Sequence, residues 1–218
     1  HDRLATIASH TDLGSGMQVA MKDLEIRGAG NLLGGEQSGH IADVGFDLYL
    51  RLVGEAVDEF RGERAEPESD MRIELPVEAH LPTDYIESER LRLEMYKRIA
   101  EVRTEADLGA VMAELADRYG DPPAPVTALL SVARFRILAR ECGVSEVVAQ
   151  GSFVRFAPAG LPDSRELRLK RVYPGSVTKD SHVLVPRPMA SVVPKVQLAG
   201  QALLDWATDV VRALYGSE

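Results

Sequence analysis

Apolar residues recur every three or four positions in five stretches of this chain, the spacing typical of amphipathic helices. The stretches cover residues 46–60, 91–102, 108–119, 126–137 and 202–214. Three of them follow one another between residues 83 and 142 with only short connections, so we expect three helices packed against one another. The last closes the chain as a helix, with Trp206 among its inward-facing residues.

Local signals indicate where the three central helices begin and end. Thr104, followed by Asp107 three residues later, resembles a capping box and starts the second helix, which Gly120 ends. Asp121 and Pro122 are interpreted as the N-cap and first residue of the third helix. The buried stripe of the second helix is assigned to Leu108, Val111, Met112, Leu115 and Tyr119.

Strand patterns flank these helices. Ile73, Leu75 and Val77 alternate with polar residues, as in a half-buried strand. Further strands are expected over residues 144–149, 153–156 and 182–185, the first two joined as a hairpin. Residues 161–172 predict a short basic helix, whereas the proline-rich VPRPMASVVP predicts no regular structure. Because helices and strands are grouped rather than alternating, the expected fold class is α+β.

A charged stretch divides the chain. RGERAEPESD, residues 61–70, is almost free of apolar residues and is typical of a linker. We therefore expect an N-terminal segment over residues 1–45, built as a helical hairpin and loop, and a connecting helix with its linker over 46–70. A compact α+β domain then covers 71–218, with a three-helix cluster, short strands and a C-terminal helix.

Composition limits the cellular compartment and the binding partners that we expect for this chain. The 218 residues carry a net charge of −9, with an isoelectric point of about 5.1, so bulk charge does not attract the chain to DNA. A single cysteine, Cys142, suits a reducing, cytoplasmic compartment, and no apolar run is long enough to cross a membrane. Because the chain starts at His1 without an initiator methionine, we expect it to belong to a longer protein.

A glycine-rich loop raises the question of nucleotide binding. In DLEIRGAGNLLGGEQSG, residues 23–39, a short alternating run that predicts a strand is followed by Gly28, Gly30, Gly34 and Gly35. The spacing is one residue longer than the dinucleotide fingerprint, and the acids that could bind a ribose, Asp47 and Asp58, lie within a predicted helix. No Gly-Lys-Ser/Thr of a P-loop occurs. A glycine turn needed only for its backbone angles is the simpler interpretation.

The same stretch resembles the translocation motif shared by RecG helicases and the bacterial transcription-repair coupling factors (Mfd). The matching positions are Asp23-Leu24-Glu25, Arg27-Gly28, Gly30, Leu33-Gly34 and Gln37-Ser38-Gly39. RLATIASHTDLGSGMQVAMKDLEIRGAG, which runs into this motif, matches as well. Later stretches resemble the coupling factors rather than RecG, namely GFDLYLRLVGEAV, ELPVEAHLPTDYI, RLEMYKRIAEVRTEADL and ELADRYGDPP. The resemblance covers nearly the whole chain and thins over residues 144–194.

This resemblance implies part of an ATP-driven translocase on double-stranded DNA, which displaces stalled RNA polymerase and recruits the excision-repair protein UvrA. ATP and Mg would bind motor domains upstream of His1, so we expect no catalytic residue and no cofactor in this chain. By position, the residues that would couple ATP hydrolysis to translocation in the family are Arg3, Arg27 and Gln37. The glycines that would let the loop backbone come close to the moving element are Gly28, Gly30 and Gly34. Without the resemblance, Arg3 would be interpreted as a solvated arginine on a helix, and Arg27 as a donor of hydrogen bonds to nearby carbonyls.

The resemblance also implies that the C-terminal domain is an inhibitory clamp over the UvrA-binding surface of the protein's N-terminal domain. It assigns this contact to Glu114 and Asp117, which lie roughly 115° or more from the centre of their helix's apolar stripe. Ala110 and Ala113 share their face, and a helical wheel turns Arg118 toward the flank of the stripe. Without the family, a solvated acidic face is the ordinary interpretation.

Two other functions are open at this point. A dinucleotide-binding enzyme would use the loop Gly28–Gly34 and predicts saturable nucleotide binding, whereas a structural adaptor predicts no link to a motor. The scattered histidines and the lone cysteine lack metal-ligand spacing, so no metal site is expected. A basic cluster beside Tyr173 is either solvated or in contact with DNA; its members are Arg165, Arg168, Lys170 and Arg171.

Overall fold

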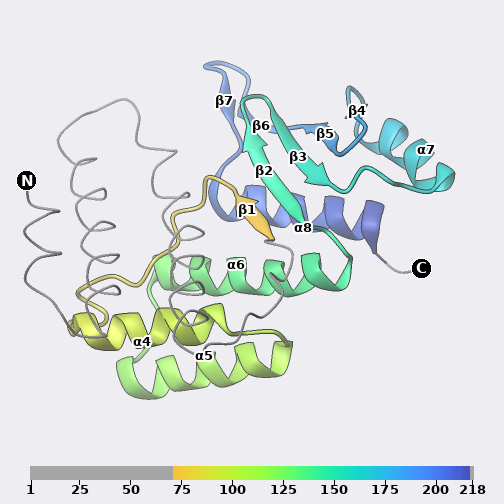
Figure 1. Cartoon of the computed structure of the whole chain (residues 1–218). Coiled ribbons are helices and arrows are strands. Elements are labelled where there is room, and N and C mark those ends of the chain that lie inside the picture. The colour runs from red at the N-terminus through yellow and green to blue at the C-terminus, as the bar shows by residue number, and fades with distance from the viewer. Residues whose placement is uncertain (1–70, 217–218) are drawn as a thin grey trace, which may run out of the picture.

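The structure, a computed structural model, describes residues 71–216 (Figure 1). The segments expected over residues 1–45 and 46–70 lie outside the described residues, and so do Arg3, Arg27, Gln37 and the glycine loop. The described elements are, in chain order, β1 (Arg72–Glu74), α4 (Glu89–Ala100), α5 (Glu105–Tyr119), α6 (Ala124–Glu141), β2 (Glu146–Gln150), β3 (Phe153–Ala157), α7 (Asp163–Val172), β4 (Val177–Thr178), β5 (Val183–Pro186), β6 (Met189–Ser191), β7 (Val196–Gln197) and α8 (Gly200–Tyr215).

Helix α5 begins and ends where the sequence predicts. The Thr104 hydroxyl accepts a hydrogen bond from the Asp107 N–H at 3.1 Å, and the Asp107 carboxylate accepts one from the Thr104 N–H at 2.9 Å. This is the reciprocal capping box. Hydrogen bonding to the Asp107 carboxylate, by the Thr104 side chain first and then by the backbone N–H groups of Arg103 and Thr104, lowers the pKa of Asp107. Gly120 ends the helix with a φ of +81°, a backbone conformation that favours glycine.

Helix α6 joins two apolar cores. Leu129 and Ile137 are buried in a helical cluster with α4 and α5. Phe135 and Ala139, on the opposite side of α6, are buried in a second cluster with the sheet and α8. The helix starts at Ala124 with Pro123 as its N-cap, so the prediction that placed the cap at Asp121 is wrong by two residues.

The sheet has five strands in the order β1-β2-β3-β5-β4. Strand β1 pairs with β2 in parallel, and the other neighbours are antiparallel. Inward-facing residues follow the period-two pattern of strands, with Val147 paired to Phe156 and Val154 paired to Val185, all buried. The predicted hairpin of β2 and β3 is confirmed, with Gly151 at a φ of +58° in its turn.

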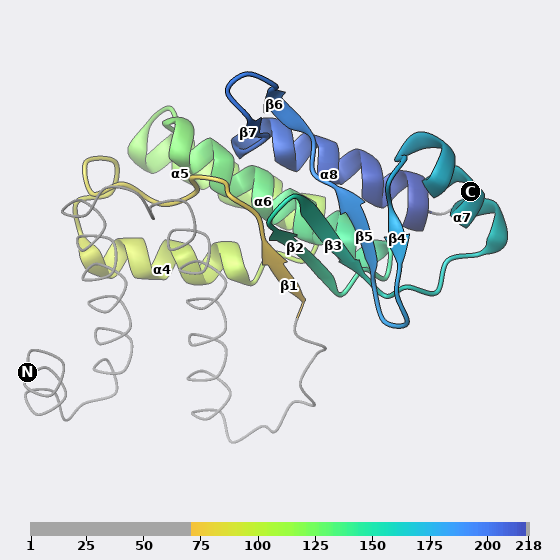
Figure 2. The same ribbon diagram turned by 90° about the horizontal axis from the view of Figure 1, so that it is seen from above.

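Helix α8 covers the inner face of this sheet and runs beside α6 (Figures 1 and 2). Its half-buried Trp206 meets Phe156 of β3 and Tyr173 at ring-centroid distances of 6.2 Å each. Both ring pairs are in the edge-on arrangement that aromatic quadrupoles prefer. The α8 stripe is therefore correctly predicted, and it forms the core between helix and sheet.

Two sequence predictions need correction. The segment VPRPMASVVP is regular in part, because it contains the end of β5 and strand β6, which forms a separate two-stranded sheet with β7. Met112, assigned to the buried stripe of α5, is 38% exposed and lies near Arg134 of α6, with 3.9 Å between Sδ and Nη2. The α+β class itself is confirmed by five helices and mixed sheets within residues 71–216.

The domain boundary expected near residue 70 leads to a prediction about folding. Since α6 contributes to both apolar cores, residues 71–218 expressed alone should unfold in one cooperative transition. Circular dichroism and calorimetry should give the same midpoint and agreeing calorimetric and van't Hoff enthalpies. Two separated transitions, or a gradual melt, would contradict both the boundary and the coupling through α6.

Candidate interdomain contact on helix α5

Helix α5 lies at the surface of the helical layer and is held there from three sides. Leu108 and Leu115 on its inner face are fully buried against α4 and α6. The Tyr85 hydroxyl, from the loop before α4, donates to the carbonyls of Leu115 and Gly120 at 3.3 and 3.0 Å. Because the last turn of a helix leaves carbonyls without helical partners, Tyr85 fixes the end of α5 that carries Glu114 and Asp117.

The outward face of α5 is composed of small residues and one acid. Every member of this face is exposed, namely Ala106, Gly109, Ala110, Ala113, Ala116 and Asp117. Among the residues that the structure describes, no hydrogen bond or ion pair engages Asp117. Small side chains let another surface approach the helix backbone closely, so a cation from a partner would reach Asp117 directly.

Glu114, unlike Asp117, is paired with arginines of the same domain. One of its carboxylate oxygens accepts a hydrogen bond from Arg118, one turn later on α5, at 2.8 Å, and the other accepts one from Arg98 of α4. Its side chain is 20% exposed, against 46% for Arg98 and 38% for Arg118. The bond to Glu114 raises the pKa of Arg118, whose guanidinium also lies 5.1 Å from the Tyr119 ring centroid.

These contacts could not all be obtained from a helical wheel. The wheel places Arg118 toward the apolar stripe, but its long side chain reaches Glu114 at i−4, where opposite charges pair favourably. Arg98 was missed altogether, because it precedes Glu114 by sixteen residues and approaches it only through the packing of α4 beside α5. A weak signal was present: Glu94 and Arg98 repeat the i, i+4 charge spacing of Glu114 and Arg118.

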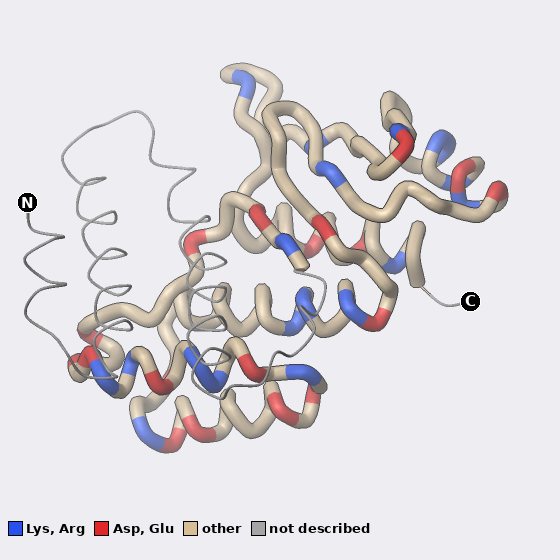
Figure 3. The backbone as a smooth tube through the Cα atoms, viewed as in Figure 1, with Lys and Arg blue, Asp and Glu red and all other residues tan. Residues whose placement is uncertain are grey.

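A second ion pair borders the other side of the outward face. Arg134 of α6 contacts the Glu105 carboxylate at 3.1 Å, close to the first turn of α5. Figure 3 shows the acidic and basic positions interspersed along α4 and α5. The small-residue face with Asp117 thus lies between two cross-helix ion pairs, Arg98–Glu114 and Arg134–Glu105.

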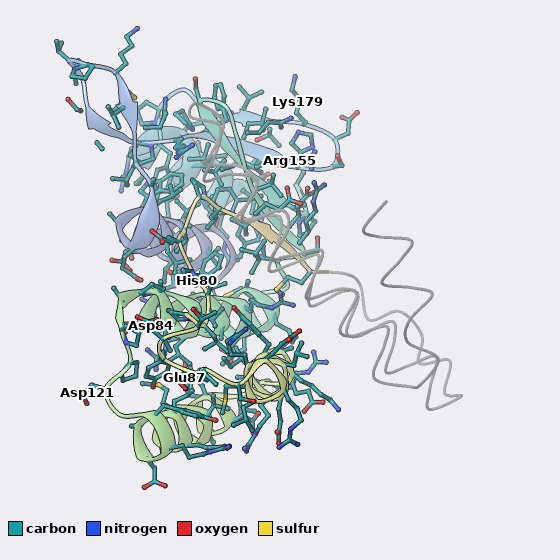
Figure 4. All side chains as sticks on the ribbon, turned by 90° about the vertical axis from the view of Figure 1, so that its left-hand side faces the viewer. His80, Asp84, Glu87, Asp121, Arg155 and Lys179 are labelled. Carbon is teal, nitrogen blue, oxygen red and sulfur yellow. The ribbon has the colours of Figure 1, made fainter. Side chains whose placement is uncertain are left out.

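Charge is distributed unequally between the helical and sheet-bearing ends of the domain. Residues 83–121, which hold α4 and α5 but not α6, contain ten acidic and six basic residues, whereas residues 142–216 contain six acidic and nine basic ones. Figure 4 shows Asp84, Glu87 and Asp121 at the helical end and, at the other end, Arg155 and Lys179. The helical end therefore suits a cationic partner surface.

The basic cluster on α7 has a structural role that the sequence did not indicate. Arg165 donates to the carbonyls of Leu214 and Gly216, and Arg168 donates to the carbonyl of Ala213 at 3.0 Å. These carbonyls end helix α8, where cations interact favourably with the helix dipole. Two of the four basic residues are therefore engaged in holding α7 against α8.

Other site chemistry is sparse in the described part of the chain. Within residues 71–216, no group of three or more histidine, cysteine, aspartate or glutamate side chains is arranged to hold a metal ion. Cys142 is a free, partly buried thiol packed against the sheet core, and burial raises its pKa. No described helix combines the length and apolarity needed to cross a membrane.

Comparison of the sequence with known proteins identifies its family. Residues 75–164, which include all of α4, α5 and α6, match the TRCF domain. The sequence is 49% identical over 230 residues to the transcription-repair-coupling factors of Mycobacterium bovis and Mycobacterium tuberculosis, with 99% of this chain covered. The chain belongs to the transcription-repair-coupling factor family. A coupling factor from Staphylococcus epidermidis is 45% identical over 156 residues, which cover 71% of this chain and 13% of that protein.

The coupling-factor chain spans 19% of the length of its mycobacterial relatives. A solved structure described as the C-terminal domain of transcription-repair coupling factor aligns with a TM-score of 0.48 and 20% identity. That alignment covers 66% of this chain and 93% of the solved chain. The outward face of α5 lies wholly within the residues that match the TRCF domain.

Proposed function

We propose that this chain is the C-terminal part of an ATP-dependent translocase on double-stranded DNA, which displaces stalled RNA polymerase and recruits nucleotide excision repair in the cytoplasm. ATP and Mg bind the motor domains of the longer protein, and residues 1–45 couple their hydrolysis to movement. The support is the match to coupling factors over 99% of the chain. That match extends across the glycine loop and disfavours a dinucleotide-binding enzyme.

Residues 71–218 act, in this proposal, as an inhibitory clamp on the N-terminal domain that binds UvrA. The observation that carries this part is the outward face of α5, where exposed Asp117 lies beside Glu114 among small residues. Arginines of the N-terminal domain would pair with these two acids. Charge-assisted hydrogen bonds of this kind are stronger than neutral ones, and they set the register of an interface.

The energetic requirement on the clamp is modest. While the clamp is mostly closed, losing about 1.4 kcal/mol of closing free energy raises the open population about tenfold. The apparent affinity for UvrA then rises by the same factor, because only open molecules bind. Two desolvated arginine–carboxylate pairs across a domain interface can supply this much.

The proposal is tested by replacing both acids with alanine in the longer protein. Glu114→Ala with Asp117→Ala should raise UvrA affinity about tenfold and increase the ATPase rate measured without polymerase. Calorimetric titration with UvrA gives the affinity, and a thermal melt verifies that the domain stays folded. The matched control is Asp205→Ala with Asp209→Ala on α8, which removes the same charge from exposed positions of another helix. A folded α5 variant with unchanged UvrA affinity would remove both acids from the clamp.

A further inference from the structure

The state of Glu114 points to a regulatory feature of the proposed clamp. Each of its carboxylate oxygens already accepts one hydrogen bond within the domain, one from Arg98 and the other from Arg118. Each oxygen keeps a second lone pair, so a further arginine could still bond to Glu114. It would, however, approach two bound guanidiniums of like charge, which weakens that pairing while both internal arginines stay. Asp117, three residues away on the exposed face of the same helix, faces no such competition among the described residues.

The structure also offers an acceptor for a displaced arginine. Glu94 on α4 precedes Arg98 by four residues, the spacing at which opposite charges on a helix meet. The negative charge of Glu94 also contributes to raising the pKa of Arg118 on α5, because it stabilises the charged guanidinium. Each helix thus carries one acid and one arginine at i, i+4 spacing, Glu94 with Arg98 on α4 and Glu114 with Arg118 on α5. Tyr119 gives Arg118 a further contact through its ring.

We propose that Arg98 and Arg118 compete with the partner domain for Glu114, so that the clamp closes in two stages. Asp117 makes the first contact, and Glu114 binds the partner strongly once an internal arginine shifts toward Glu94. This inference rests on the proposed clamp function. Its consequence is that the internal arginines weaken closure: they stabilise the open state, in which Glu114 is paired inside the domain.

The competition predicts an effect of opposite sign from the loss of the acids. Arg98→Ala in the longer protein removes one of the two positive charges bound to Glu114, so an incoming arginine should pair with Glu114 more strongly, the clamp should close more tightly and UvrA affinity should fall. Partly exposed ion pairs are weak, so the expected decrease is about two- to fivefold. Arg98→Lys retains a charge but loses the planar fork, and it should lie between wild type and Arg98→Ala. Arg118→Ala should act in the same direction.

The matched control is Arg90→Ala, which removes a positive charge from an exposed position of the same helix without touching Glu114. Glu114→Ala combined with Arg98→Ala should show no added effect of the arginine change, because the competed group is gone. Thermal melts verify folding, and Arg98→Gln replaces Arg98→Ala if the alanine variant does not fold.

The outcomes separate this inference from the proposal on which it rests. Weaker UvrA binding by Arg98→Ala, unchanged binding by Arg90→Ala, and no arginine effect without Glu114 would support the competition. Unchanged or tighter binding by Arg98→Ala would overturn it, even where the double acid variant raises affinity as the clamp predicts. If the double acid variant has no effect on UvrA binding, the clamp contact itself is wrong and the competition is overturned with it.

Discussion

Arg27→Ala in the longer protein is expected to leave ATP binding intact and to abolish translocation and polymerase displacement. Arg27 lies between a predicted strand and a run of glycines in the segment that matches the family's translocation motif. A guanidinium offers five donors in a planar fork, which suits a bridge between a moving element and several acceptors at once. Removing it should uncouple hydrolysis from movement rather than prevent hydrolysis. Translocation on duplex DNA and displacement of a stalled polymerase are the activities to measure.

Two companion variants sharpen this prediction. Arg27→Lys keeps the charge and loses the fork, so it should recover only part of the displacement activity. Gln37→Ala should reduce displacement less than Arg27→Ala, because an amide makes fewer and uncharged hydrogen bonds. Nucleotide binding, followed by a fluorescent ATP analogue, should match wild type in all three. Normal displacement by Arg27→Ala would show that the glycine loop does not couple the motor through this arginine.

Removing residues 71–218 from the longer protein should have a larger effect on UvrA binding than any substitution on α5. The double acid change removes two ion pairs but leaves the small-residue face of α5 and its flanks in contact with the partner domain. Deletion removes all of these contacts, so we expect UvrA affinity to rise more than the roughly tenfold predicted for the acids. The polymerase-independent ATPase rate should rise with it. A truncated protein that binds UvrA as weakly as the intact one would contradict an inhibitory role.

The local features of the fold were predictable because their causes lie close together in the sequence. The capping box of Thr104 and Asp107 and the stop at Gly120 need only neighbouring residues, and both are found as expected. The hairpin of β2 and β3 follows from two runs rich in valine and phenylalanine on either side of Gly151. In contrast, the pairing of β6 with β7 was missed, since prolines in that segment suggested an irregular structure.

Features that depend on packing could not be obtained in this way. The parallel pairing of Ile73 with Val147 joins strands separated by three helices. The Arg98–Glu114 ion pair and the contact of Arg165 with the end of α8 likewise join distant parts of the chain. The exposed face of α5 was therefore predictable from its spacing, whereas the pairing of Glu114 required the structure. That difference separates Glu114 from Asp117 in the proposed site.

The clamp is tested most directly with the C-terminal domain and the rest of the protein as two separate molecules. The longer protein lacking residues 71–218 is titrated with UvrA, first alone and then with increasing amounts of purified residues 71–218. If the domain is a clamp, the truncated protein alone should bind UvrA tightly, and added wild-type domain should progressively weaken this binding. The domain carrying Glu114→Ala and Asp117→Ala should weaken it little. If the added wild-type domain leaves UvrA affinity unchanged at concentrations well above that of the truncated protein, the clamp is contradicted.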